Sequence, residues 1–453
     1  MHSSFLQRGG AATAVLALVL APLAAAADDA APATTVDPAV AAMVGGVSAA
    51  RLRASDERLV AFGTRNLFSE RSTDPKRGVY AARDWIATQF RALERSSGGR
   101  LRVALDTYVQ PKTDRTPRDV EVSSVYATLR GDDPARGTYV MSSHYDSRNS
   151  DGNDAKLDAP GADDNASAVA AVLEAARVMA STHFRGTIVF ACFDGEEQGL
   201  FGSAHFAKYL KDSGVRVDGN LNDDIVGASV GHGGENAAHD VRLFSEALPA
   251  AADPNRVRAL GTENDSPARE LARFAKETGE AYVPSMHVNL IYRSDRFLRG
   301  GDQQSFAEQG FAAVRYVEPF ENFDHQHQNV RVENGVQYGD LVKYVDFDYL
   351  ARVTQLNVAA LATLALAPAA PAPKLLAKEL GYDSTLQWDA VPGATRYTVV
   401  WRRTDEPVWT HARDAGAATS LTLPLSKDDW LFGVRAVDAN GDASVAAFPV
   451  PLR

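Results

Sequence analysis

Cysteine is almost absent from this chain of 453 residues. The single cysteine, Cys192, excludes an intramolecular disulfide, which many exported proteins use for stability. Because Cys192 lies within the apolar run TIVFACF, we interpret it as a small core residue and not as a nucleophile or a metal ligand. The fold must therefore do without cysteine cross-links.

Basic residues are too few to suggest a nucleic-acid-binding protein. The chain has 47 Lys and Arg against 58 Asp and Glu, which gives a formal net charge of −11. Binding to phosphates requires clustered Lys and Arg, so this acidic balance argues against a nucleic acid as partner. It leaves the nature of a small substrate open.

Long apolar runs are lacking except at the N-terminus. There the run AATAVLALVLAPLAAAA follows Arg8, is broken by Pro22 and ends in small residues. This pattern is typical of a secretory signal peptide, residues 1–27, and fits a membrane anchor less well. No later stretch approaches the ~20 uninterrupted apolar residues of a membrane span. We therefore expect an exported protein, secreted or periplasmic, without stable membrane insertion.

The remaining chain divides into two regions. In residues 28–366, strand-like runs such as GTIVFACFD alternate with helical runs such as NASAVAAVLEAARVMAS, which predicts an α/β sheet covered by helices. The Pro/Ala-rich residues 367–373 resemble a stiff linker. In residues 374–453, short strand-like segments between turns predict a small all-β sandwich.

Acids and histidines gather where the predicted strands end. Each of the segments SSHYDS and LNDDIVG closes an apolar run, PGADDNAS leads into a helix, and FDGEEQG follows a strand. A later cluster, ENFDHQHQNV, holds two histidines. Functional groups of α/β proteins collect at strand ends, although each segment alone has a simpler explanation, such as helix capping by Asp164 and Asn165.

Together these segments supply the ligands of a hydrolytic metal site. Zinc prefers histidine nitrogen and carboxylate oxygen ligands with one position left open, and two ions about 3.5–4 Å apart need a shared carboxylate. The adjacent Glu196 and Glu197 could then have different roles, one binding metal and the other accepting a proton from water. Cobalt or manganese would fit the same ligands.

In their order, HYDS, GADDNAS, FDGEEQGLFGS and LNDDIVG resemble the motifs of the co-catalytic zinc aminopeptidases of the bacterial leucyl aminopeptidase type. This family is related to glutamate carboxypeptidases and glutaminyl cyclases. The resemblance covers roughly Val40 to Leu366 and implies a mixed, mostly parallel sheet flanked by helices, with two Zn²⁺ per chain. It implies an exopeptidase that removes N-terminal residues from peptides, using a water between the metals that a glutamate activates.

The resemblance also implies a role for each motif residue. Glu196 matches the general base, and Asp146 matches the carboxylate that orients a metal-bound histidine ring. The implied metal ligands are His144, Asp164, Glu197, Asp224 and His325. For the last ligand, the family has a histidine followed four residues later by aspartate, which aligns His325 with Asn329 in the aspartate position and leaves His327 as the alternative.

The tail, residues 374–453, resembles a fibronectin type III domain. Trp388 in LQWDAV and Tyr397 in RYTVVW fit the pattern of that fold. The resemblance implies no catalysis, so we expect a spacer or stabilising module, with a cell surface or a polymer as candidate contact.

Other functions stay open. A carboxypeptidase or dipeptidase acting on acidic peptides would need basic pocket residues, for which Arg293, Arg296 and Arg299 are candidates. A glutaminyl cyclase would keep one zinc, and a non-catalytic binding protein would tend to lose the base or the ligands. A serine hydrolase would use Ser229 in GASVG, but the sequence after it lacks the helix that this motif requires.

Overall fold

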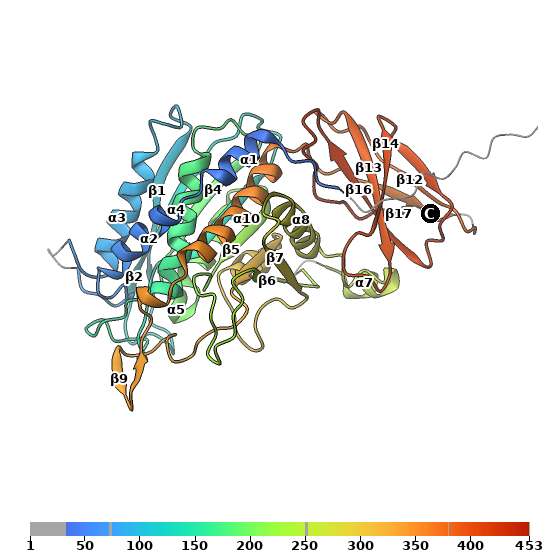
Figure 1. Ribbon diagram of the computed structural model, residues 1–453. Helices are drawn as coiled ribbons and strands as arrows, with labels where there is room; N and C mark the ends of the chain where they lie inside the picture. Colours follow the sequence, from blue (N-terminus) through green and yellow to red (C-terminus); the bar gives the residue numbers. More distant parts are fainter. Residues whose placement is uncertain (1–32, 72–74, 250–251, 379, 453) are drawn as a thin grey trace, which may run out of the picture.

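A computed structural model describes residues 33–71, 75–249, 252–378 and 380–452 (Figure 1). The predicted signal peptide, residues 1–27, lies outside the described residues. Within them, the chain forms a large α/β region followed by a smaller β region, which lie side by side in Figure 1.

The α/β region is built on one sheet with the strand order β1-β2-β4-β3-β5-β8-β6-β7. Its strands are β1 (Leu101–Gln110), β2 (Val120–Leu129), β3 (Thr138–His144), β4 (Thr187–Phe193), β5 (Val217–Asp223), β6 (Asp240–Ser245), β7 (His287–Ile291) and β8 (Ala313–Val317). The central strands β4, β3, β5 and β8 are parallel, as are β6 and β7, and the other pairs are antiparallel. The predicted mixed, mostly parallel sheet is confirmed.

Helices cover both faces of this sheet because its strands alternate their apolar side chains. Met141 and Phe190 face one core, and Val140 and Val189 face the other. The first core is closed by α1 (Pro38–Gly45), α2 (Ala49–Val60), α3 (Val79–Ala92), α4 (Ala168–Met179), α8 (Pro267–Tyr282) and α10 (Phe347–Leu366). The second is closed by α6 (Phe201–Asp212) and α9 (Gln303–Glu308). Several helices of the first set cross the front of the sheet in Figure 1.

Three smaller elements complete the α/β region. They are α5 (Glu196–Gly199), α7 (Pro254–Leu260) and a hairpin of β9 (Arg331–Glu333) and β10 (Val336–Tyr338). A short π-helix, Ala162–Ser167, precedes α4, and a 3-10 helix, Val342–Tyr344, precedes α10.

Helix α10 is long and apolar enough to cross a membrane, and among the described residues it is the one helix that meets this test. However, 83% of the most apolar 18-residue stretch of this helix is buried inside the molecule. Its Asn357 also donates a hydrogen bond of 2.9 Å to the buried carboxylate of Asp223 on β5. We therefore describe α10 as a core helix.

The C-terminal region contains two small sheets, in agreement with the predicted all-β fold. One has the order β15-β12-β11-β17 and the other β14-β13-β16. The strands are β11 (Lys374–Leu376), β12 (Ser384–Gln387), β13 (Arg396–Arg403), β14 (His411–Gly416), β15 (Ser420–Leu423), β16 (Trp430–Val437) and β17 (Val450–Leu452). Both sheets contribute to one core, with Leu386 and Leu423 from the first and Trp401 and Phe432 from the second.

Candidate metal centre

Three neighbouring strands bring the first site residues together. His144 is the last residue of β3, Asp224 follows β5 directly, and Glu196 and Glu197 open the short helix α5 after β4. Because β4, β3 and β5 are adjacent and parallel, their carboxyl ends meet at one edge of the sheet. These residues, which are far apart in the sequence, therefore lie close together in space.

Asp164 reaches the same edge from the loop before α4. The backbone there leaves the helical conformation at Asp164 and Asn165, and the peptide bond between these residues is cis. Asp340 fixes the loop by accepting hydrogen bonds from the backbone N–H groups of Asp163 and Asp164, at 2.9 and 2.8 Å. The fully buried Arg65 donates to the carbonyls of Pro160 and Gly161.

Two groups of possible metal ligands meet at the carboxylate of Asp164. The Nε2 atom of His144 lies 3.2 Å from Asp164 Oδ1 and 3.5 Å from Asp224 Oδ1. The Nε2 atom of His327 lies 2.9 Å from Asp164 Oδ2 and 3.0 Å from Glu197 Oε2. In each group the ligand atoms lie within 4.8 Å of one another. Asp164 thus offers one oxygen to each group.

This donor set fits zinc. Each group combines one imidazole nitrogen with two carboxylate oxygens, which is the ligand chemistry of hydrolytic zinc sites. The second oxygen of Glu197 is buried without a hydrogen-bond partner among the described residues. A buried carboxylate oxygen without a partner is costly, and a cation would satisfy it.

The structure brings His327, and not His325, to the carboxylates of Asp164 and Glu197. The His325 ring stacks on Tyr344, with 3.6 Å between the ring centroids, and belongs to neither group. A turn at Asn322, whose carbonyl accepts from the N–H groups of His325 and Gln326, is followed by a left-handed residue at His327. This backbone turn directs His327 towards Asp164 and leaves His325 beside Tyr344.

Asp146 contacts both the His144 ring and the backbone at the start of α5. One of its carboxylate oxygens lies 3.4 Å from His144 Nδ1, which leaves Nε2 of that ring facing Asp164. The carboxylate also accepts hydrogen bonds from the backbone N–H groups of Glu196 and Glu197, at 3.1 and 3.2 Å. One fully buried side chain therefore fixes the histidine ring and the start of α5.

Glu196 belongs to neither group of ligands. It lines a cavity of about 470 Å³ together with His144, Asp164, Glu197 and Asp224. Burial raises the pKa of the Glu196 carboxyl well above its usual range, the positive charge of His144 opposes this shift, and Asp224 and Glu197 add to it. Glu196 is thus a carboxyl group beside the ligands with a raised affinity for a proton.

The histidines hold protons strongly when no cation is present. Burial works against the charged ring of His327, but Glu197 and Asp164 outweigh it and raise its pKa to about 10. Burial likewise opposes the charged ring of His144, and the neighbouring carboxylates, Asp224 first, raise its pKa well above the usual range. The carboxylates attract positive charge to the two places where the ligand groups lie.

A sequence profile of "Peptidase family M28" matches residues 124–334. A "probable zinc metalloprotease" from Leptosphaeria maculans is 46% identical over 419 residues, which cover 91% of this chain and 97% of the relative. The chain belongs to peptidase family M28. The aligned share is larger than the part of the chain that ends with α10, so this M28 relative also matches part of the C-terminal β region.

Solved structures share the fold of this M28 chain. The Legionella pneumophila LapA aminopeptidase matches with a TM-score of 0.51 at 17% identity, covering 74% of this chain and 78% of that one. A glutaminyl cyclase from Macrostomum lignano matches with a TM-score of 0.52 at 15% identity, covering 72% and 92%. At this identity the likeness concerns the fold alone.

The M28 site contains two charged residues that the sequence analysis missed. Arg315 on β8 is fully buried, with Nη2 3.0 Å from Asp224 Oδ2 and Nη1 2.8 Å from Asp295 Oδ2. Asp302 is also buried, and burial above all raises its pKa to about 7, opposed by the charge of His144. Asp302 lies in GGDQQSF just before α9, but no sequence pattern distinguishes Arg315 within its apolar strand.

Ser229, the serine of the alternative hydrolase motif, and Cys192 lie outside the M28 site. Ser229 donates a hydrogen bond of 2.7 Å to Asp346, and turns and strand β6, not a helix, come directly after it, so the nucleophile motif lacks its structural context. Cys192 is fully buried in the core, and burial raises its pKa to about 12. The interpretation of Cys192 as a core residue agrees with this position.

Proposed function

We propose that this protein is an exported aminopeptidase that holds two Zn²⁺ ions. Membership of family M28 makes it a peptidase, and the shared carboxylate of Asp164 between two ligand groups is the observation that supports two metal positions. The His144, Asp164 and Asp224 side chains would hold one ion, and Asp164, Glu197 and His327 the other. The expectation of export rests on residues 1–27 of the sequence.

Bound zinc would polarise the substrate carbonyl and acidify a water molecule. Glu196 is the general base in this proposal, because it lines the cavity beside the ligands without belonging to either group. Its carboxylate takes a proton from the attacking water and returns it to the leaving amine. Asp146 keeps the His144 ring and the backbone of Glu196 in place while this happens.

The aminopeptidase assignment is supported by the four motifs in their order. Its test is a pair of substrates, leucine p-nitroanilide and the same compound with an acetylated amine. An aminopeptidase cleaves the free-amine substrate and leaves the acetylated one. Equal cleavage of both would overturn the assignment without affecting the membership of family M28.

A second candidate is a carboxypeptidase or dipeptidase that acts on acidic peptides. Arg296 and Arg299 line the cavity, as do Arg115 and Arg148, whereas Arg293 is exposed beside Phe297. Arg115 and Arg148 donate to backbone carbonyls, and no carboxylate holds them or Arg299 among the described residues. Guanidinium groups without a carboxylate partner can bind a substrate carboxylate in bidentate fashion.

Peptides with blocked ends separate these two candidates. Cleavage of Leu-Gly-amide as fast as Leu-Gly would show that the terminal carboxylate is not required, as the aminopeptidase proposal expects. Strong loss of cleavage with the amide, together with cleavage of an acetylated acidic dipeptide, would favour the second candidate. In the second case, Arg299→Gln should weaken substrate binding, and Arg293→Gln is the matched control outside the cavity.

We also propose that residues 374–453 form a fibronectin type III-like module. The support is the sequence pattern around Trp388 and Tyr397, which pack in one core between the two small sheets. Contact of this tail with a cell surface or a polymer stays a prediction. A pull-down with the isolated polymer and the full chain would test it.

A further inference from the structure

Buried charges hold the C-terminal β region against helix α8 and against Asp265, which precedes this helix. Arg402 on β13 pairs with Asp265, and both side chains are fully buried. Trp409 donates a hydrogen bond of 3.1 Å to Glu270, which also pairs with Arg273. A buried charge that loses its partner is strongly destabilising, so these pairs hold the two regions in one relative position.

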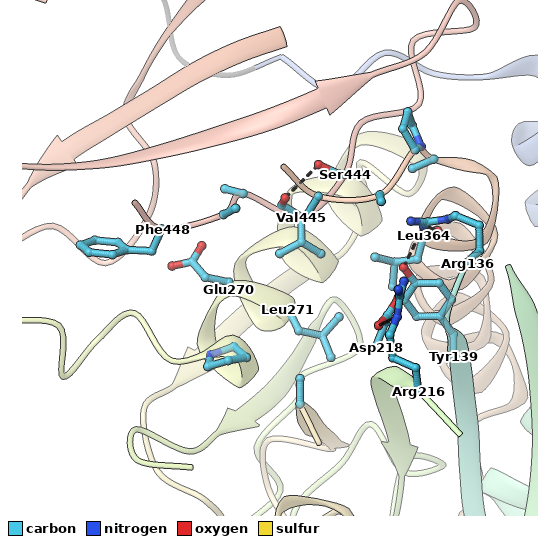
Figure 2. A pocket seen from close by; sticks show the side chains of 18 of the residues that line it. Arg136, Tyr139, Arg216, Asp218, Glu270, Leu271, Leu364, Ser444, Val445 and Phe448 are labelled. Atoms are coloured by element: carbon cyan, nitrogen blue, oxygen red, sulfur yellow. Dashed lines mark hydrogen bonds and ion pairs between the residues drawn. The ribbon is translucent and has the colours of Figure 1, made fainter. Parts of the chain in front are cut away.

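A cavity lies between α8 and the tail, although Val445 of the tail also packs on the core of the α/β region. The cavity has a volume of about 520 Å³, and Glu270 and Leu271 of α8 line it together with Val445 and Phe448 of the tail (Figure 2). The buried polar contacts beside the cavity, together with the packing of Val445, hold the two regions in their relative position.

Another contact of the tail involves Tyr292, the first residue of a loop that lines the cavity at the metal centre. Tyr292 follows β7, and its hydroxyl donates a hydrogen bond to the carbonyl of Pro407 in the tail. Arg273, which also donates to the Pro407 carbonyl at 2.6 Å, lies over the Tyr292 ring. Arg269 packs over the same ring, 4.5 Å from its centroid. Tyr292 is thus held between the tail and α8.

The loop that starts at Tyr292 forms a wall of the cavity at the metal centre. Arg296, Leu298 and Arg299 of this loop line the cavity. Within the loop, Asp295 pairs with Arg315, and Arg315 also binds the carbonyl of Gly300 at 2.8 Å and the carboxylate of Asp224. The loop therefore contacts the tail at one end and a candidate metal ligand, through Arg315, further along.

We propose that the C-terminal β region positions the wall loop, residues 292–302, through the Tyr292–Pro407 contact and so helps to determine substrate binding. In this proposal the tail influences substrate binding at the active site and does not serve only as a spacer. Tyr292 acts as a positioning residue, because it contacts neither the ligand groups nor Glu196. The effect on catalysis rests on the proposed peptidase function, whereas the effect on the loop does not.

The test compares Tyr292→Phe with two controls in the full-length chain. Tyr292→Phe removes only the hydroxyl that donates to Pro407. Tyr382→Phe makes the same chemical change at a tail residue that is 86% exposed. Arg435→Gln breaks a different contact between tail and α8, the 2.6 Å pair with Glu277, away from the loop. All three variants keep the buried Arg402–Asp265 pair.

Two readouts separate positioning from general stability. In Tyr292→Phe, we expect amide hydrogen exchange of residues 292–302 to become about threefold to tenfold faster, the range for loss of one hydrogen bond. The KM for a peptide should rise by a similar factor while kcat changes less than twofold. Both controls should leave loop exchange and KM as in the wild type.

Unchanged loop exchange in Tyr292→Phe would overturn the proposal. An equal increase of loop exchange in Arg435→Gln would also overturn it, because the tail would then act only through overall stability. If loop exchange rises as expected but no peptide is cleaved by any variant or by the wild type, the proposed function fails and the positioning of the loop stands.

Discussion

The Nε2 atom of His327 lies 2.9 Å from one carboxylate oxygen of Asp164, whose other oxygen lies 3.2 Å from His144. This relationship links the ends of β3, the loop before α4 and the segment after β8 in one arrangement. The Asp340 carboxylate holds the loop that carries Asp164, because it accepts hydrogen bonds from the backbone N–H groups of Asp163 and Asp164.

His327→Ala should remove one of the two zinc ions that we propose for each chain. His327 is the imidazole donor of the second group, and two carboxylates alone would bind zinc far more weakly. Elemental analysis of the purified variant after dialysis measures the loss. His325→Ala is the matched control, because its ring stacks on Tyr344, and it should keep the zinc content of the wild type. The opposite pattern would restore His325 as the ligand.

Glu196→Gln should keep its zinc and lose catalysis. The substitution removes the proton acceptor but leaves both ligand groups unchanged, so turnover should fall by about 10²–10⁴-fold. Glu197→Gln is the comparison, since Glu197 belongs to a ligand group and its loss should reduce zinc content. Loss of zinc from the Glu196 variant and its retention in the Glu197 variant would exchange the two roles.

Arg315→Met should destabilise the protein. Removal of the guanidinium leaves Asp224 and Asp295 buried without their partner, and breaking a buried ion pair costs about 3–5 kcal/mol. Urea denaturation of the metal-free protein measures the free energy of unfolding. Arg293→Met, at an exposed position, should change it by less than about 0.5 kcal/mol. Similar values for both variants would show that the buried network contributes little.

Zinc binding should become weaker as the pH falls. In the metal-free protein Glu197 and Asp164 raise the pKa of His327 to about 10, so this ring is protonated at pH 7, and the carboxylates beside His144 raise the pKa of that ring above its usual range. Zinc binds the neutral ring, so binding must displace protons, and the apparent affinity rises with pH. Calorimetric titrations in buffers of different ionisation enthalpy count the released protons. An affinity that does not vary between pH 6 and 8 would contradict these shifts.

The stability of the metal-free protein should change with pH in the opposite direction and decrease as the pH rises. A histidine with a raised pKa in the folded state contributes stability while it is protonated. For His327 this contribution is complete below the unfolded value of about 6.5 and is lost as the pH rises towards 10. Thermal unfolding of metal-free protein should therefore give a lower Tm at pH 9 than at pH 6.5, and His327→Gln should reduce this difference.

The sequence predicts the parts of the site that depend on local structure. His144, Asp164, Glu197 and Asp224 each follow or precede a strand or helix with a clear pattern, and parallel strands bring such ends together. The choice between His325 and His327 depends on a left-handed backbone residue inside a turn, which no sequence pattern marks here. Alignment to the family motif favoured His325, whereas the structure places His327 beside Asp164 and Glu197.

Other parts of the site depend on contacts between distant segments. Arg315 lies in an apolar strand, and its partners Asp224 and Asp295 are 91 and 20 residues away, so only the folded sheet shows the network. The position of the tail also depends on a contact between distant segments. Its strands can be predicted from their turns and aromatic residues, but the Arg402–Asp265 pair that joins it to α8 spans 137 residues.

The zinc content of the protein shows whether Asp164 serves two metal positions at once. The mature wild-type protein should contain two zinc ions per chain after dialysis against metal-free buffer. Asp164→Asn should lose both, because it weakens both groups, whereas His327→Ala should lose one. A wild type with a single zinc, or an Asp164→Asn variant that keeps both ions, would contradict the account.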